Sequence, residues 1–449
     1  MKHITFIIFC LAYMISFSCN KILEEKSDKS LSTPNSISSL QEMLDYANVM
    51  DVAPSWSEGA SDNLYIEDSK LDQYGQLSID AYTWLPILYD GGDWPRLYQT
   101  IYVANTVIEE ANKIKPSNSS RDAWNNVLGS ALFYRAQSYF DGALTFCLGF
   151  DTTTANKNWG MVLRLSSDFN LASERVSLMK TYNQIINDLI MAKNLLPLYS
   201  STIYRPSKCA AYGLLSRVYL SMREYNMAGL YADSCLQNYN RLLDYNTLDL
   251  SVSSQFNIDN PEVIFTRFVS SFALASASPK SVLVDSALYE MYDDNDLRKL
   301  AFFKAKGSGH FFKGSYSSSY TKLFAGVATD EMYLIRAECL ARKGLYKDAL
   351  NDLNKILIKR WKTDDYTPYT VDSVSKVLDL ILKERRKELL FRCLRWMDIK
   401  RLNLDGYNII LKRVVHGKEF VLAPNSKAYA IPIPATVVSS YGVPQNDYN

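Results

Sequence analysis

The sequence predicts a mainly α-helical protein, in which paired helices stack into a superhelix that carries long loops and a few short strands. Three observations indicate this fold class. Apolar residues recur at helical spacing on both sides of Gly344, and the same pattern recurs upstream in the chain. Two long stretches rich in aromatic residues, 51–93 and 240–328, interrupt that periodicity, and loops of such length are usually functional or disordered.

The clearest helical pair surrounds Gly344. The first predicted helix carries Ala337 and Ala341 on one face, and the second carries Ala349. The Gly-x-Tyr-x-x-Ala pattern of the turn is the tetratricopeptide signature. Aligning Tyr225 with Tyr346, a shift of 346 − 225 = 121 positions, places Ala228 on Ala349. A second helical pair is therefore expected over 207–222 and 225–236.

Other segments keep the helical spacing of apolar residues, so further helices are expected over 37–50, 94–114, 123–146 and 178–196. The predicted repeat helices thus occupy about 94–146, 178–238 and 329–358. Within the second interruption, residues 262–268 favour a strand and residues 285–292 a short helix.

The N-terminal residues are typical of a secretory signal. Lys2 precedes an apolar run from Ile4 to Phe17, which is too short to span a bilayer, and Ser18 stands directly before Cys19. We expect residues 1–18 to be removed and Cys19 to be acylated; an ordinary signal peptide with a free Cys19 is the alternative. Residues 19–36 are expected to form a polar tether, and residues 37–449 the body.

Composition gives little sign of a charged partner. Lysine and arginine exceed aspartate and glutamate by 49 − 48 = 1, so no field of one sign favours nucleic acid or anionic lipid. The cysteines after Cys19 form no C-x-x-C pair, and buried free thiols are expected over disulfides or zinc ligands. These cysteines are Cys147, Cys209, Cys235, Cys339 and Cys393.

The most specific motif lies at 384–401, where Glu384-Arg-Arg-Lys-Glu-Leu-Leu-Phe391 is followed by Arg395-Trp-Met-Asp-Ile-Lys-Arg401. Together with the helical pair at Gly344, it resembles the SusD/RagB family of surface nutrient-binding lipoproteins of Bacteroidetes. Arg392 and Cys393 replace the Glu-Gly that is usual in the family, so a local contact is expected to differ there. Weaker matches extend the resemblance from Cys19 to Tyr448.

The resemblance implies a non-enzymatic protein that is anchored to the outer membrane at the cell surface through Cys19. It implies no cofactor, and a role in binding an oligosaccharide and delivering it to a SusC-like TonB-dependent transporter. RagB-like members, which take peptides, resemble the chain equally, so the choice between sugar and peptide stays open. A surface glycoside hydrolase and a protein-binding scaffold are the alternatives from other classes.

Aromatic side chains in the irregular segments 51–93 and 307–320 are the candidate ligand platform, because a flat ring can stack on a pyranose face. For each ring alone, packing in the core is the alternative. The predicted ligand-binding residues are Trp56, Tyr65, Trp84, Tyr89, Asp90, Phe311, Phe312 and Tyr316.

No residue is predicted to be catalytic or to bind a metal. Carboxylate pairs such as Asp90 with Asp93 lie in polar surroundings, where solvated charge is favoured over glycosidase chemistry. The group Asp293 to Asp296 lacks the spacing of a calcium loop, and helix termination is the favoured interpretation. An ion-pair network that joins the Glu384–Glu388 helix to the segment 395–401 is expected, with Trp396 packed beside it.

Overall fold

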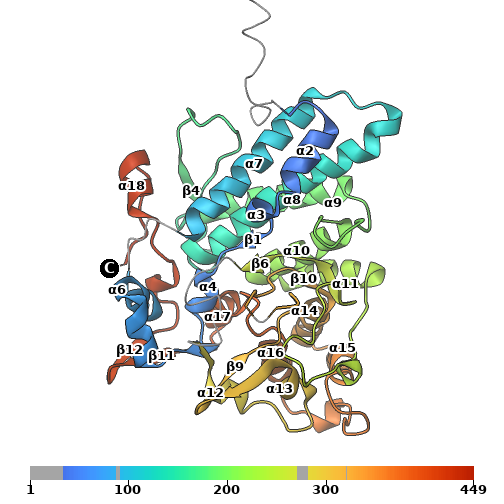
Figure 1. The fold of residues 1–449 in the computed structure, drawn as a ribbon, viewed down its shortest axis with the longest axis vertical. Coiled ribbons are helices and arrows are strands. Elements are labelled where there is room, and N and C mark those ends of the chain that lie inside the picture. Colours follow the sequence, from blue (N-terminus) through green and yellow to red (C-terminus); the bar gives the residue numbers. More distant parts are fainter. Residues whose placement is uncertain (1–33, 87–91, 270–281, 320, 449) are drawn as a thin grey trace, which may run out of the picture.

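A computed structural model describes residues 34–86, 92–269, 282–319 and 321–448 of the chain. Its main feature is a row of consecutive helices, each packed on the next (Figure 1). This confirms the mainly α fold class. The row comprises α7 (Asp93–Lys113), α8 (Arg121–Phe146), α9 (Leu178–Leu195), α10 (Lys208–Ser221), α11 (Tyr225–Asn238), α14 (Thr329–Arg342), α15 (Tyr346–Leu357) and α16 (Val377–Glu388).

The two helical pairs form where the sequence predicts them. Ser207 caps α10 by accepting a hydrogen bond from the backbone N–H of Ala210. Gly344 adopts φ of +77° between α14 and α15, a conformation that glycine reaches without strain. Ala228 and Ala349 are fully buried, and the Ser216 hydroxyl donates to the carbonyl oxygen of Ala228 at 2.9 Å. Small side chains therefore allow these helices to approach closely.

Near the N-terminus, the single helix expected over 37–50 is divided into α2 (Ile37–Leu44) and α3 (Ala47–Met50). Asp45 lies at the break, and its carboxylate binds the Arg205 guanidinium at 2.8 and 2.5 Å. The stretch 51–93 is less irregular than expected. It contains α4 (Trp56–Gly59), α5 (Asp68–Leu71) and α6 (Gln76–Tyr82).

The described strands form six separate pairs. These strand pairs hold loops against the helical body. The strand expected near 262–268 appears as the two short strands β5 and β6. The pairs are β1 (Val52–Ala53) with β6 (Phe268–Val269), β2 (Leu64–Tyr65) with β7 (Leu283–Val284), β3 (Trp159–Val162) with β4 (Arg175–Ser177), β5 (Val263–Phe265) with β10 (Val327–Ala328), β8 (Phe303–Lys306) with β9 (Gly309–Phe312), and β11 (Leu411–Val415) with β12 (Lys418–Leu422).

Four further helices complete the described elements: α12 (Ser286–Tyr289), α13 (Leu297–Phe302), α17 (Arg395–Leu404) and α18 (Ala435–Tyr441). Asp296 accepts a hydrogen bond from the backbone N–H of Arg298, so it starts α13 rather than ending the helix before it. Its carboxylate is also fully buried against the Arg298 side chain at 2.7 Å. The expectation of a solvated surface carboxylate is therefore wrong for Asp296. It is also wrong for Asp93, which is 1% exposed and accepts hydrogen bonds from the backbone N–H groups of Ser55 and Trp56 at 2.7 and 2.9 Å.

The core lies mainly between the stacked helices. A second apolar cluster forms beneath α12, α13 and the β8–β9 hairpin, and a small third one surrounds Trp396. All five described cysteines are free, and four of them are buried, as expected. Within the described ranges, no helix has both the length and the apolar character needed to cross a membrane.

Candidate ligand-binding face

Three of the predicted site residues belong to the core. The exposed fractions of Trp56, Phe312 and Tyr316 are 6%, 4% and 1%. Tyr316 donates its phenolic proton to the Glu262 carboxylate at 2.5 Å, and Phe312 packs on Phe391. These rings fill the second apolar cluster, which corrects the expectation that they form a surface platform. Tyr89, Asp90 and Cys19 lie outside the described residues.

Tyr65 and Phe311 are half-buried, and they come from the two segments that were expected to meet. The segments do meet here, because a Cβ added to Gly309 would lie 2.6 Å from the Tyr65 hydroxyl. Trp84 lies elsewhere, against the Trp396 cluster. The structure thus joins part of the predicted group and leaves Trp84 apart from it.

Trp84 is held in a fixed position. Its indole N–H donates to the carbonyl oxygen of Ala60 at 2.9 Å, and the Arg413 guanidinium lies 4.7 Å from its ring. The ring borders a small hollow of about 20 Å³, which we call the Trp84 pocket. The pocket is lined by Trp56, Ala60, Ala81, Trp84, Leu85, Pro86, Trp396, Ala428, Ile431, Pro432 and Tyr448.

A larger cavity of about 300 Å³ lies between α7, the loop 163–173 and α18, and we call it the α7–α18 groove. Its volume is at the lower end of the range for ligand sites. The groove is lined by Trp94, Tyr98, Ile101, Tyr102, Asn105, Val162, Arg164, Ser166, Ser167, Phe169, Ser173, Val437, Tyr441 and Val443. The C-terminal segment 428–448 contributes lining residues to both hollows.

Sequence reasoning missed this groove. One signal was present: Leu165, Phe169 and Leu171 are apolar residues within an otherwise polar loop, and all three are largely exposed. An exposed apolar group of this kind indicates a contact surface more often than a plain connection does.

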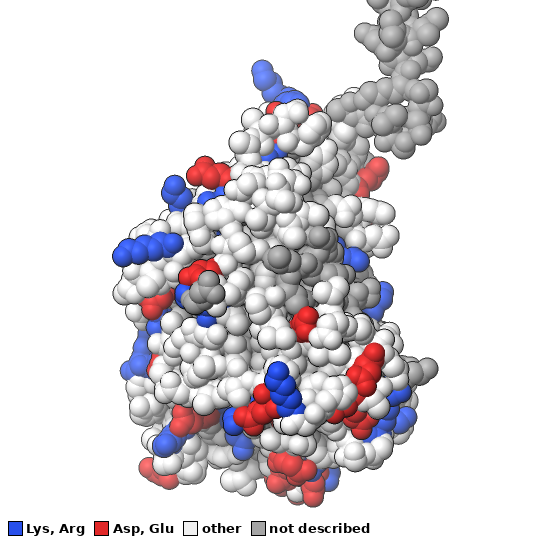
Figure 2. Space-filling view, turned by 90° about the vertical axis from the view of Figure 1, so that its left-hand side faces the viewer, with Lys and Arg blue, Asp and Glu red and all other residues white. Residues whose placement is uncertain are grey.

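The side of the molecule that bears α6, α18 and β12 carries few charged side chains over its middle (Figures 1 and 2). Figure 2 shows uncharged surface over much of the middle of this view, an acidic group near the centre, and acidic and basic groups at the margins and across the lower part. A face of this character attracts neither anionic nor cationic ligands over a distance. We call it the uncharged face.

The predicted ion-pair network is confirmed. The Arg385 guanidinium binds the Asp398 carboxylate at 2.9 Å, and Arg401 binds the same carboxylate at 2.8 Å and Glu338 at 2.5 Å. Trp396 is 1% exposed beside them. These contacts join α16 to α17 and α14, so the motif residues of 384–401 hold the body together.

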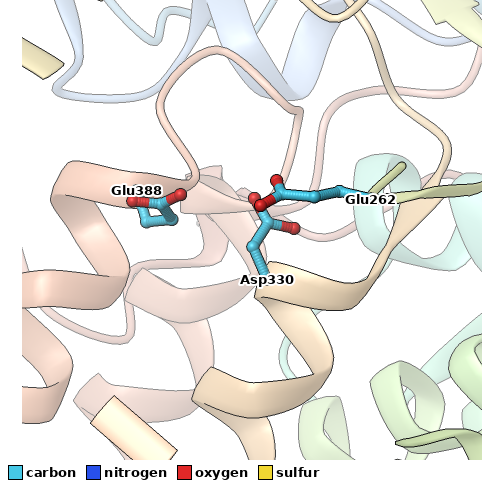
Figure 3. Close-up of side chains that lie close together, drawn as sticks. All are labelled: Glu262, Asp330 and Glu388. Atoms are coloured by element: carbon cyan, nitrogen blue, oxygen red, sulfur yellow. The ribbon is translucent and has the colours of Figure 1, made fainter. Parts of the chain in front are cut away.

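Three buried carboxylates, Glu262, Asp330 and Glu388, lie within 4.8 Å of one another (Figure 3). Each one binds an arginine: Glu262 and Glu388 bind Arg360, both at 2.7 Å, and Asp330 binds Arg392 at 2.7 Å. Burial raises the pKa of Asp330 to about 6, and the charges of Glu262 and Glu388 add to that effect. Arg298 also binds Glu388 at 2.9 Å, so three guanidinium groups pair with the three carboxylates in a buried ion-pair cluster.

The departure from the family pattern lies in the same region. Arg392 supplies the partner of Asp330, and its guanidinium also lies 4.2 Å from the Tyr316 ring. Cys393 adopts φ of +60°, a conformation that favours glycine, and its backbone N–H donates to the Glu58 carboxylate at 2.7 Å. Arg392 and Cys393 thus bind two buried carboxylates, those of Asp330 and Glu58, at the positions of the usual Glu-Gly.

Two family models match the chain. One, described as starch-binding and associating with the outer membrane, matches residues 21–220, and one described as the SusD family matches residues 329–440. SusD-like protein P2 of Formosa agariphila is 24% identical over 377 residues, which are 70% of this chain and 72% of that protein.

Solved structures share the fold over nearly the whole chain. A candidate sugar binding protein of Bacteroides vulgatus has a TM-score of 0.77 at 18% identity, covering 93% of this chain and all of that one. A SusD superfamily protein of Bacteroides thetaiotaomicron has a TM-score of 0.75 at 19% identity, covering 92% of this chain and all of that one. These matches and the motif at 384–401 lead to one conclusion: the chain belongs to the SusD/RagB family.

Proposed function

We propose that this protein is a cell-surface lipoprotein of the outer membrane that binds a nutrient oligosaccharide and delivers it to a SusC-like TonB-dependent transporter. The observation that carries the proposal is the uncharged face, with two hollows bordered by aromatic side chains. A neutral, polyhydroxylated ligand suits such a face because aromatic rings contact its apolar sides without any charge to compensate. The outer-membrane description of the matching family supports the location.

Anchoring through Cys19 would help the protein to work with weak contacts. A binding protein that is tethered beside a transporter holds its ligand at a high effective concentration, so moderate affinity is sufficient for transfer. Of the predicted platform residues, Trp56 and Trp84 line the Trp84 pocket.

A ligand screen tests the proposal. The mature protein in detergent is titrated by calorimetry with neutral oligosaccharides and, in parallel, with short peptides. Binding of an oligosaccharide supports the proposal. Binding of peptides alone would assign the protein to the RagB-like alternative, and release of reducing ends during incubation would favour the glycoside hydrolase.

A further inference from the structure

We infer that the α7–α18 groove is the principal site for the glycan, and that it takes a neutral oligosaccharide whose pyranose rings stack on Tyr102, Phe169 and Tyr441. The inference rests on the proposed function and adds to it the place of binding and the class of glycan. Five features of the structure support it: exposed aromatic side chains, a loop fixed by hydrogen bonds, few charged groups in the lining, backbone groups that are already paired, and the small volume of the Trp84 pocket.

The exposed aromatic residues of the groove are the first feature. Phe169 is 80% exposed and Tyr441 is 64% exposed, and they are the two most exposed aromatic side chains among the described residues. Tyr102, on α7, is 51% exposed. An aromatic side chain that stays in water forgoes the favourable free energy of burying its apolar surface. Three exposed rings around a cavity of about 300 Å³ indicate that the groove is built to be covered by a ligand.

The loop that presents Phe169 is fixed by its own hydrogen bonds. The Arg164 guanidinium donates to the carbonyl oxygens of Leu171 and Asp168 and to the Ser173 hydroxyl. At its base, Tyr139 donates to the carbonyl oxygen of Arg164 at 2.6 Å. A loop that is ordered before binding loses little conformational entropy when the ligand arrives.

Charge limits the class of glycan. Among the described residues that line the groove, Arg164 is the one charged residue, and both of its terminal nitrogens, Nη1 and Nη2, donate to the loop. The nearby Glu109 carboxylate accepts hydrogen bonds from Ser166 and Ser167. Recognition of a carboxylate or sulfate usually uses an arginine or lysine aimed at the ligand. The groove therefore suits neutral sugars better than uronic or sulfated ones.

The backbone around the groove favours sugar over peptide. An extended peptide needs a row of unpaired backbone donors and acceptors. Two walls of the groove are the helices α7 and α18, whose backbone donors and acceptors are largely paired within each helix. The third wall is the loop 163–173, where the Arg164 guanidinium already binds the carbonyl oxygens of Leu171 and Asp168. Side chains, mostly rings and hydroxyls, are thus the groups that the groove presents to a ligand.

The Trp84 pocket is less suited to hold a sugar ring. Its volume is about 20 Å³, against about 300 Å³ for the groove. The indole N–H of Trp84 is already donated to Ala60, and Arg413 lies against its ring. We therefore expect Trp84 to contribute at most a peripheral contact.

The test uses alanine variants and a panel of defined probes. Wild type, Phe169→Ala, Tyr441→Ala, Trp84→Ala and Tyr46→Ala are titrated with maltoheptaose, cellohexaose, xylohexaose, mannohexaose and hexagalacturonate. Tyr46 is the matched control, because it is 56% exposed and does not line the groove. Thermal midpoints of all variants are measured first, and the substitutions of the exposed Phe169, Tyr441 and Tyr46 should leave them unchanged.

We expect at least one neutral probe to bind. The Phe169→Ala and Tyr441→Ala variants should each bind it about 3- to 10-fold more weakly, as the loss of one aromatic contact predicts. Trp84→Ala and Tyr46→Ala should change the affinity less than twofold. Raising NaCl from 50 to 500 mM should leave the affinity within about twofold, since no ion pair is screened.

Two results would overturn the inference while leaving the proposed function in place. One is normal binding by both groove variants together with a large loss in Trp84→Ala. The other is binding of hexagalacturonate alone, with a steep dependence on salt. Failure of every carbohydrate probe counts against both the inference and the proposed function.

Discussion

Glu58 offers a sharp test of the electrostatics that fix the stretch 51–93 to the body. It is fully buried on α4, where its carboxylate accepts hydrogen bonds from the Asn63 side-chain amide at 2.8 Å and the Cys393 backbone N–H at 2.7 Å. Burial raises the pKa of Glu58 from its ordinary 4.5 to about 7. The folded state therefore binds the proton more tightly than the unfolded state does.

The sign of the effect follows from this shift. Stability from Glu58 is fully present below pH 4.5 and is lost as the pH rises through 7. The shift of 7 − 4.5 = 2.5 units corresponds to about 3 kcal/mol of unfolding free energy. Glu58→Gln removes the titration, so between pH 4.5 and 8.5 the variant should lose about 3 kcal/mol less stability than the wild type.

Glutamine fits this position well. The Asn63 side-chain oxygen is buried without a hydrogen-bond partner among the described residues, so a rotated Asn63 amide could accept the new Gln N–H. The measurement is urea unfolding at both pH values, with Glu67→Gln as the control because Glu67 is exposed. Asp51 and Asp330 also have raised pKa values, but they are present in all three proteins and cancel in the comparison. Parallel pH profiles for wild type and Glu58→Gln would refute the reasoning.

Three further predictions concern the scaffold and the anchor. Ala228→Trp and Ala349→Trp, at fully buried positions, should each cost about 1–3 kcal/mol or more of unfolding free energy by overpacking. Leu230→Trp, at a position that is 55% exposed, should not have this cost. Equal denaturant midpoints in all three variants would count against close helix packing. Asp398→Ala should cost about 3–5 kcal/mol of unfolding free energy, because it leaves Arg385 and Arg401 buried without this partner. Asp379→Ala, in an exposed pair with Lys376, should cost less than about 1 kcal/mol. Similar losses of unfolding free energy in both variants would disprove the structural role of the network. Cys19→Ala should release the protein from membranes while the body still folds, and fractionation that finds it in the outer membrane would end the lipoprotein proposal.

The stacked helices could be predicted from sequence because their signals are local. Periodic apolar residues, the turn at Gly344 and the buried Ala228 and Ala349 each depend on neighbours within a few turns of helix. The ion pairs of Arg385 and Arg401 could also be predicted from sequence, because the motif 384–401 contains both arginines and their shared partner Asp398. Arg385 lies on α16, and Asp398 and Arg401 lie three residues apart on one face of α17.

The ligand face could not be predicted in the same way. An aromatic ring in an irregular segment has the same local pattern whether it is buried or exposed. Tyr316, for example, is buried with its hydroxyl donating a hydrogen bond to Glu262, and that partner lies 316 − 262 = 54 positions away. The rings of the groove come from Tyr102, Phe169 and Tyr441, and no short window of sequence contains more than one of them.

The separation of those three residues also governs when the groove can exist. Tyr102 and Tyr441 are 441 − 102 = 339 positions apart, so a chain that has folded only in part has no groove. Glycan binding should therefore report complete folding, and a bound glycan should stabilise the whole molecule by linkage rather than one segment of it. Hydrogen exchange would show this as slower global opening when the ligand is present, with added protection throughout the described helices rather than in α7 and α18 alone.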